Sequence, residues 1–358
     1  MVVRRATIKD VAARAGVSPA TVSNVLLGRK AASLDVADRV RAIAGELGYS
    51  PDRAASQLRS GKTRIVTALV PNLTDPFFAA VIDAFERQAQ ADGFDLIVAS
   101  SNATEEGERK RLSALLSWRP AGVVVIPQSD AFPSRQEIDA LRLPYVVVDR
   151  ASSKLPVDAV VSGNREATAE AVGYLLDQGH DSMLVVASTF RLENIRERYQ
   201  GVIDQFATRG LPPPPSLEVG LTFEMVAERL AVWLADNKRP TAILTVTNFV
   251  TMGVMAHFAQ IGTRVPRDVS LIGFDDYPWM RAASPAITAI RQDVAALAEQ
   301  AWTMLRARMA DAAAPVRRVT VPCRLVMRDS VRRAGRPVEP VAALQPWPAP
   351  MRPLTSPD

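Results

Sequence analysis

The sequence lacks most of what a disulfide-rich, membrane-bound or secreted protein needs. Its single cysteine, Cys323, excludes an internal disulfide framework and a metal site built only from cysteines. No apolar run approaches the ~20 residues of a membrane-spanning helix. The first ten residues also lack the apolar core of a signal peptide. We therefore expect a protein of the cytoplasm.

Histidines are also scarce, and catalytic motifs are missing. His180 and His257 are the only two histidines, and neither belongs to a His-Glu-x-x-His zinc motif. No Gly-x-Ser-x-Gly nucleophile elbow occurs. Residues 61–63, Gly-Lys-Thr, resemble the end of a phosphate-binding loop, but Ser56 stands where that loop needs its first glycine. We predict that the chain is not an enzyme and holds no cofactor and no metal.

The charge of the chain is concentrated at its start. The 358 residues, 48% hydrophobic and 23% charged, are typical of a globular protein of two or three domains. Residues 1–62 carry eleven basic and five acidic side chains, a net charge of +6, whereas the remainder carries −1. A small basic module ahead of a near-neutral body favours a head that binds a polyanion such as DNA.

The pattern of the basic segment predicts three short helices. Thr7 is placed to cap a helix over 8–15, which Gly16 ends, and Ser18 precedes a second helix over 19–27. Ser33 is placed to cap a third helix that runs to Leu47. Small residues on the outer face of the second helix suit entry into the major groove, which is ~12 Å wide. The pattern alone also fits a plain three-helix bundle, but the positive charge favours a helix-turn-helix head.

Two stretches carry a specific resemblance. Residues 7–26, TIKDVAARAGVSPATVSNVL, and 46–58, ELGYSPDRAASQL, resemble the opening of the lac repressor (LacI/GalR) family of bacterial transcription regulators. The resemblance implies that Pro19, Ala20 and Asn24 read bases. It also implies phosphate contacts, which hydroxyl groups suit because phosphate oxygens accept their hydrogen bonds. The residues at those positions are Thr7, Ser18, Thr21, Ser23, Ser33 and Tyr49.

The same resemblance implies a hinge helix over 50–62. A helix this short is marginal alone, so we expect it to form only against a second subunit and DNA. Leu58 matches a residue that wedges into the minor groove, and Arg59 is expected to reach adjacent phosphates, with Arg53 also among the DNA-binding residues. Without the motif, packing of Leu58 into a core would be the simpler interpretation.

The body alternates short apolar runs with helical patterns. Strands are predicted over 65–70, 96–99, 123–126 and 145–149 for one parallel sheet, and over 183–187, 242–246 and 269–273 for another. The predicted fold class is α/β, a small all-α helix-turn-helix head joined to a two-lobed body with doubly wound parallel sheets. The predicted divisions are a head over 1–49, a hinge over 50–62, a body over 63–333 and a Pro-rich, disordered tail over 334–358. We assign the lobes of the body to 63–161 with 292–321, and to 162–291 with 322–333.

The body resembles the periplasmic-binding-protein-like sensor domain of the same family, on residues 75–78, 144–150, 178–180 and 265–276. Ligands of such sheets bind beyond the carboxyl ends of the strands. Phe77 or Phe78 is expected to stack on a sugar ring, and polar groups to hydrogen-bond hydroxyls. An aspartate after a strand also often caps the next helix. The full set of expected effector residues is Asp75, Phe77, Phe78, Asp149, Arg150, Arg198, Asn248, Phe249 and Asp275.

Together these features predict a homodimeric regulator, a repressor rather than an activator, that reads a near-palindromic operator in double-stranded DNA. A small-molecule effector, a sugar or sugar derivative bound between the two lobes, is expected to change operator affinity. We expect the protein to be associated with the nucleoid and to have no membrane partner. The alternative is a small-molecule receptor of the periplasmic-binding type without a DNA function, which would need an export signal and no basic head.

Overall fold

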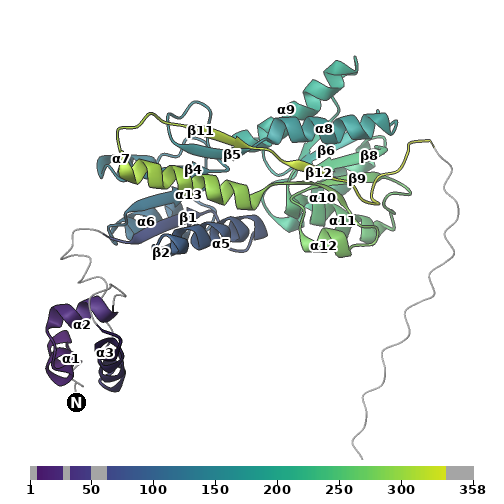
Figure 1. Ribbon diagram of the computed structural model, residues 1–358. Helices are drawn as coiled ribbons and strands as arrows, with labels where there is room; N and C mark the ends of the chain where they lie inside the picture. Colours follow the sequence, from purple (N-terminus) through teal and green to yellow (C-terminus); the bar gives the residue numbers. More distant parts are fainter. Residues whose placement is uncertain (1–5, 27–32, 50–62, 336–358) are drawn as a thin grey trace, which may run out of the picture. The chain divides into compact units, whose positions relative to one another are not determined.

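The computed structural model describes residues 6–26, 33–49 and 63–335 (Figure 1). The chain divides into two compact units. Unit 1 holds the chain up to Val148, together with Leu155–Ala159 and Ala298–Arg318. Unit 2 holds Asp149–Lys154, Val160–Leu297 and the chain from Val319 onward. Hinge residues Arg53, Leu58 and Arg59 lie outside the described residues, so their expected roles stay predictions.

The head consists of three helices, α1 (Ile8–Ala15), α2 (Pro19–Leu26) and α3 (Leu34–Glu46). Thr7 and Asp10 form a capping box at the start of α1, in which each side chain bonds the backbone N–H of the other. Gly16 ends α1 with φ +66°, a conformation that costs a residue with a side chain more than it costs glycine. One small core joins the three helices, and its fully packed members are Val11, Ala12, Ala15, Val22, Val25, Val40 and Ala44.

The predicted bounds of α1 are confirmed, and α2 agrees as far as the structure describes it, because Leu27 lies outside the described residues. The expected capping by Ser33 is wrong in part. Ser33 precedes α3, but its side chain makes no capping hydrogen bond. Ser33 and Leu34 are exposed, so water satisfies the first amides of α3.

The first sheet has six strands in the order β11-β5-β4-β3-β1-β2. Strands β1, β3 and β4 are almost wholly buried, as a sheet covered on both faces requires. The strands are β1 (Ile65–Val70), β2 (Asp95–Ser100), β3 (Gly122–Val125), β4 (Tyr145–Val148), β5 (Ala159–Ser162) and β11 (Arg318–Val321). The accompanying helices are α5 (Pro76–Ala91), α6 (Glu105–Leu116), α7 (Arg135–Ala140) and α13 (Val294–Ala310).

The second sheet repeats this arrangement in the order β12-β10-β9-β8-β6-β7. Its strands are parallel except for β12, which pairs antiparallel with β10 at the edge. They are β6 (Met183–Ala187), β7 (Ser216–Glu218), β8 (Ala242–Thr245), β9 (Ser270–Phe274), β10 (Thr288–Arg291) and β12 (Arg324–Val326). The helices are α8 (Asn164–Asp177), α9 (Glu193–Thr208), α10 (Phe223–Asp236), α11 (Asn248–Ile261) and α12 (Pro278–Ala282).

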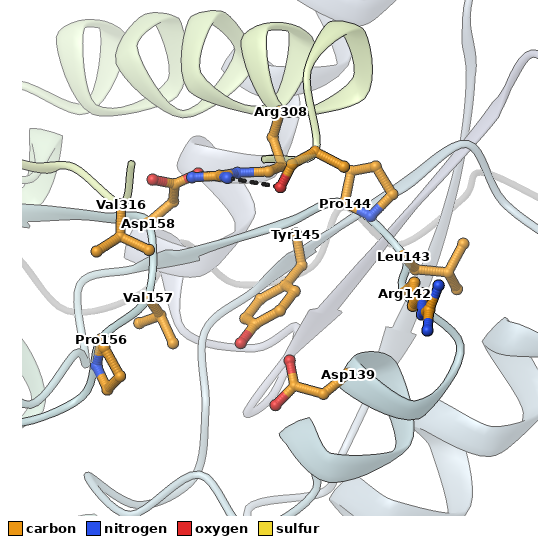
Figure 2. Close-up of a pocket in the computed structure, with 11 residues that line it drawn as sticks. Asp139, Arg142, Leu143, Pro144, Tyr145, Pro156, Val157, Asp158, Arg308 and Val316 are labelled. Carbon is orange, nitrogen blue, oxygen red and sulfur yellow. Dashed lines mark hydrogen bonds and ion pairs between the residues drawn. The ribbon is translucent and has the colours of Figure 1, made fainter. Parts of the chain in front are cut away.

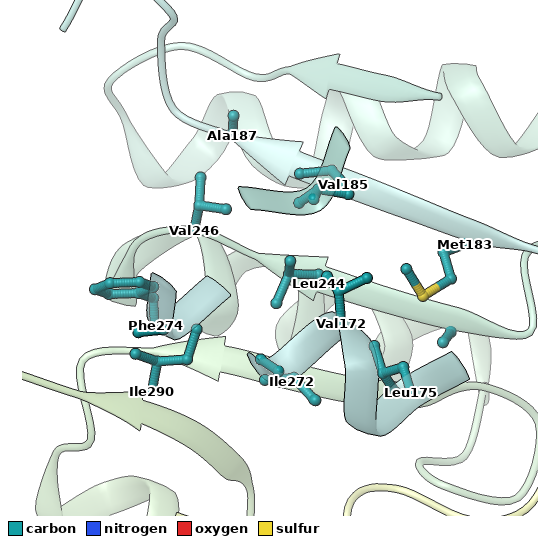
Figure 3. Close-up of a cluster of buried hydrophobic side chains, with 14 of the residues drawn as sticks. Val172, Leu175, Met183, Val185, Ala187, Leu244, Val246, Ile272, Phe274 and Ile290 are labelled. Atoms are coloured by element: carbon teal, nitrogen blue, oxygen red, sulfur yellow. The ribbon is translucent and has the colours of Figure 1, made fainter. Parts of the chain in front are cut away.

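Alternating strand residues build two cores in unit 2, one on each face of its sheet. Met183 and Val185 face the core that α8 and α9 cover (Figure 3), whereas Leu184 and Val186 face the core that α10 and α11 cover. The central strands β6, β8 and β9 are therefore buried on both sides, and only their ends are left for polar groups of the loops. This packing places the polar residues of the loops at the carboxyl ends of β6, β8 and β9.

All seven predicted strands are present, with β1 and β6 at the predicted bounds. Strands β5, β7, β10, β11 and β12 are absent from the prediction, because their three or four residues include polar or charged ones, unlike the continuous apolar runs at β3 and β4. Among the described residues, no helix is both long and apolar enough to cross a membrane.

Candidate functional site

The expected base-reading residues lie on one exposed stretch of the head. Pro19 and Ala20 are exposed at the start of α2, and Asn24 is half-buried one turn further on. Ser18 precedes α2, and its Oγ accepts a hydrogen bond of 3.1 Å from the amide of Thr21. Val22 and Val25 point the other way, into the core. Helix α2 thus presents small side chains on the face that its packing leaves uncovered.

Hydroxyl groups surround this stretch. Thr7, Ser18 and Ser33 are exposed, whereas Thr21, Ser23 and Tyr49 are half-buried. Thr7 and Ser18 each stand immediately before a helix, where backbone N–H groups point outward and attract phosphate. The roles of these residues toward bases and phosphates stay predictions.

In unit 2, Arg198 of α9 is the centre of a buried polar cluster. Its side chain is only 3% exposed. Nε donates to Asn164 Oδ1 at 2.8 Å, and one terminal nitrogen donates to the carbonyl of Val246 at 2.6 Å. The guanidinium carbon also lies over the Phe274 ring, 3.6 Å from its centroid. Three strand-end segments are thereby joined by one side chain.

Asp149 and Asp275 occupy equivalent places, directly after β4 and β9 of the two similarly ordered sheets. Both have left-handed backbones, with φ of 63° and 67°, which aspartate tolerates better than most residues. Asn194 donates to Asp149 Oδ2 at 3.1 Å, and Gln292 donates to Asp275 Oδ1 at 2.6 Å. Neither aspartate caps a helix, so the structure does not use them in the ordinary role of an aspartate after a strand.

Residues near Asp149 and at the start of α11 complete the set predicted in unit 2. Arg150 lies 3.9 Å from Asp149 Oδ2. Asn248 is 6% exposed at the first position of α11, and its Oδ1 accepts a hydrogen bond of 3.0 Å from Trp279 Nε1. Phe249 is half-buried against the core under α10 and α11.

The remaining predicted effector residues belong to unit 1. Asp75 is the N-cap of α5 and accepts from the amide of Phe77 at 3.0 Å, the ordinary role of an aspartate before a helix. Phe77 and Phe78 are buried and pack edge to face, with ring centroids 5.6 Å apart. Their expected stacking on a sugar ring stays a prediction.

Four partner residues of the cluster were not foreseen. Asn164 and Gln292 follow β5 and β10 by two and one residues, and these are two of the strands that the pattern missed. Had those strands been recognised, the polar residues at their ends would have been candidates. Asn194 and Trp279 lie within helices, and only the tertiary structure brings them to the cluster.

Two buried oxygens of this region have no hydrogen-bond partner among the described residues, Asp149 Oδ1 and the hydroxyl of Thr247. A buried polar atom without a partner costs free energy unless a ligand or a water supplies the missing hydrogen bond. Burial also raises the pKa of the Cys323 thiol to about 11, so the thiol there is neutral.

Asp276, next to Asp275, has a structural role. Its side chain is 1% exposed and forms ion pairs with Arg291 and Arg328. Burial opposes its ionisation, but the hydrogen bonds from the two guanidinium groups outweigh burial and hold the pKa of Asp276 below its ordinary value. Consecutive aspartates thus differ, one in the candidate site and one in the framework.

His180 is also structural. Its ring nitrogens lie 3.0 Å from Thr241 Oγ1 and 2.8 Å from the carbonyl of Arg332, and burial lowers its pKa. The ring thus links the residue before β8 to the segment after β12. His257 belongs to α11, and its side chain is buried.

A pocket of about 340 Å³ lies at the amino end of β4, the end of this strand away from Asp149 (Figure 2). Tyr145 and Asp139 lie side by side there, and burial, together with the Asp139 carboxylate, raises the pKa of Tyr145 to about 12. Arg308 bonds Asp158 and the carbonyls of Ala312 and Ala314, so its donors are used within the protein. None of the predicted effector residues lines this pocket.

Comparison with known proteins agrees with both halves of this description. Residues 7–52 match the family model of bacterial regulatory proteins, lacI family. Residues 172–331 match the periplasmic binding protein-like domain.

Relatives match this chain over most of its length and nearly all of theirs. The HTH-type transcriptional repressor PurR of Vibrio vulnificus is 29% identical over 334 residues, 92% of this chain and 99% of that protein. The HTH-type transcriptional regulator PtxS of Pseudomonas aeruginosa is 30% identical over 333 residues, 92% of this chain and 97% of that protein. The crystal structure of the lac repressor dimer bound to operator and the anti-inducer ONPF has a TM-score of 0.81 at 23% identity, covering 92% of this chain and 100% of that one. The chain therefore belongs to the lacI family of bacterial regulatory proteins and is a DNA-binding transcriptional regulator.

Proposed function

We propose that this regulator is a repressor that binds a near-palindromic operator as a homodimer and is controlled by a small-molecule effector. The arrangement of α2 supports operator reading, because Pro19, Ala20 and Asn24 stand on its uncovered face between hydroxyl groups suited to phosphate. The proposal includes a location in the cytoplasm on the nucleoid, and a chain without enzymatic activity.

For the effector, we propose a ligand rich in hydroxyl groups, a sugar or sugar derivative, at the polar cluster around Arg198 and Asp149. The observation that carries this proposal is the pair of buried oxygens without partners, Asp149 Oδ1 and Thr247 Oγ. Both accept hydrogen bonds, and a ligand hydroxyl donates them. The buried guanidinium of Arg198 orders the surrounding loops, so the site is preformed.

Operator binding is tested with a genomic footprinting survey of the purified protein, followed by titration of the selected fragment. We expect affinities of about 10⁻⁸ to 10⁻¹¹ M and a log-log dependence on salt with a slope of about −0.9 per neutralised phosphate. The Asn24→Ala variant should lose selectivity between fragments. Absence of any preferred fragment would refute the proposal.

The effector is tested with a thermal-shift screen of sugars, sugar acids and nucleosides, because a ligand that binds only the native state raises the melting temperature. We expect a hit among polyhydroxylated compounds that Asp149→Asn weakens at least tenfold. The matched control is Asp177→Asn, an exposed aspartate of unit 2 that pairs with Arg209. Equal effects of the two variants would remove Asp149 from the site.

A further inference from the structure

The edge of the first sheet where its parallel strands begin is also where the chain arrives from the head. Residue 63 follows the 50–62 segment directly and leads into β1. The amide of Ala121 donates to the carbonyl of Ile65 at 2.7 Å, and the amide of Val123 donates to that of Pro144 at 2.9 Å. The connections that precede β3 and β4 therefore lie beside the start of β1.

These two neighbouring connections share one local design. After α6, the chain passes through Trp118 and Arg119, and after α7 through Leu141 and Arg142. Both arginines adopt a left-handed backbone, with φ of 49° and 52°. Glycine or asparagine is the usual choice at such a position, because other side chains cost about 1 kcal/mol or more there. Both connections thus place a long cationic side chain two or three residues after the end of a helix.

The charges of these arginines are not neutralised within the described part of the chain. Both side chains are exposed, and neither has a hydrogen-bond or ion-pair partner among the residues that the structure describes. Of the carboxylates at this edge of the sheet, Asp92 before β2 lies 2.8 Å from Arg306, and Asp139 of α7 lies 3.9 Å from Arg135. The edge therefore presents two cations in a row, on connections to adjacent strands about 4.8 Å apart.

We propose that Arg119 and Arg142 bind the phosphate backbone of the DNA that the head holds. The thirteen residues 50–62 span at most about 45 Å, which sets an upper limit on the distance between the end of the head and the start of β1. Phosphate is the complementary partner for two exposed guanidinium groups, and its charges recur about every 3.4 Å along each strand. The inference rests on the proposed operator binding, to which it adds a contact made by the body.

A second type of occupant must be distinguished, because Trp118 and Leu141 are exposed apolar neighbours, 56% and 57% accessible. Tryptophan and arginine together are also typical of protein–protein interfaces. The uncompensated charge favours DNA, since a protein partner would need to bury two cations against carboxylates of its own. The experiment below separates the two.

The test compares a double variant, Arg119→Asn with Arg142→Asn, against the wild type. Asparagine tolerates the left-handed backbone, so the fold is retained while the charge is removed. The matched control is Lys238→Asn with Arg239→Asn, which removes two exposed charges before β8 of the other sheet, where Arg239 precedes proline as Arg119 does. Operator affinity is measured at several KCl concentrations by fluorescence anisotropy, with a DNA fragment selected in the footprinting survey.

We expect the slope of log K against log salt to become shallower by about 2 to 4 in a homodimer, because each lost phosphate contact removes about 0.9. Affinity at low salt should fall at least tenfold, while the control keeps the wild-type slope. Exchange of both arginines for lysine should keep most of the slope, since phosphate binding depends on charge.

An unchanged slope in the asparagine double variant would overturn the inference. If sedimentation showed that the same variant dissociates into monomers while its slope is unchanged, the edge would be a protein interface, which also overturns it. The failure of the proposed function has a separate signature, namely a wild-type protein that prefers no DNA fragment.

Discussion

The head and the unit 2 cluster place their polar groups by different means. In the head, partners are close in sequence: Thr7 bonds Asp10 and Ser18 bonds Thr21, both three residues apart. In the cluster, Arg198 bonds Asn164 and Val246 across 34 and 48 residues, and Asp149 bonds Asn194 across 45. The head groups are mostly exposed, whereas the cluster is buried.

This difference determines what each region can tolerate. Removing one side chain of an exposed hydrogen-bonded pair lowers the free energy of unfolding little, because water replaces the lost hydrogen bond. Removing one side chain of a buried pair lowers it more, since the remaining atom is left with neither water nor a partner. The head can therefore change its base contacts at small cost in stability, whereas ligand selectivity in unit 2 is tied to the stability of the fold.

The largest loss of stability is expected for Asp276→Asn, which removes the negative charge that Arg291 and Arg328 share. We expect the free energy of unfolding to fall by about 2–4 kcal/mol, less than for a fully buried pair because Arg291 is half-exposed. Urea unfolding followed by circular dichroism measures the change. The matched control is Asp204→Asn, whose partner Arg165 is on the surface, and it should change stability far less.

The same residue predicts a pH dependence. The pKa of Asp276 is lower in the folded chain than in the unfolded one. Its contribution is therefore fully present above about pH 4, the unfolded pKa, and is lost as the pH falls through the folded pKa. Part of the acid destabilisation of the wild type should be missing in Asp276→Asn. Parallel acid profiles of the two proteins would contradict this account.

A smaller loss of stability is expected for Arg198→Lys, which keeps the positive charge but not the planar guanidinium group. Lysine has no planar fork to bond Asn164 and Val246 together while covering the Phe274 ring. We expect about 1–3 kcal/mol less stability in urea and loss of the thermal shift caused by the effector. Affinity for the operator without effector should stay within twofold of wild type.

The control for Arg198→Lys is Arg196→Lys, two positions earlier on α9. Arg196 is more exposed and donates to the carbonyls of Phe190 and Arg191. That variant should keep the effector response. If both variants lose it, the response depends on α9 as a whole and not on the Arg198 contacts.

The same contrast explains what the sequence could predict. Caps and glycine stops act within one helical turn, so the bounds of α1 follow from Thr7 and Gly16. The resemblance identified Asp149, Arg198, Asn248 and Asp275 as members of the unit 2 cluster. Asn194 carries no local signal, because only the packing of α9 brings it to Asp149, and Gln292 follows a strand that the pattern missed. The structural role of Asp276 could not be predicted from the sequence either, since its guanidinium partners lie 15 and 52 residues away.

The smallest expected effect is that of Asp10→Ala in the head. The substitution opens the capping box, in which the Asp10 carboxylate accepts from the amide and the hydroxyl of Thr7 at 2.8 and 2.7 Å. The loss of a cap is worth about 1 kcal/mol, so hydrogen exchange at the α1 amides should accelerate about fivefold while exchange in unit 2 is unchanged. Asp38→Ala, which removes an exposed pair with Arg41, is the control and should leave exchange in α1 as it is. An acceleration that extended into unit 2 would show that the two regions unfold together, and the contrast between them would then fail, because a locally held head must open on its own.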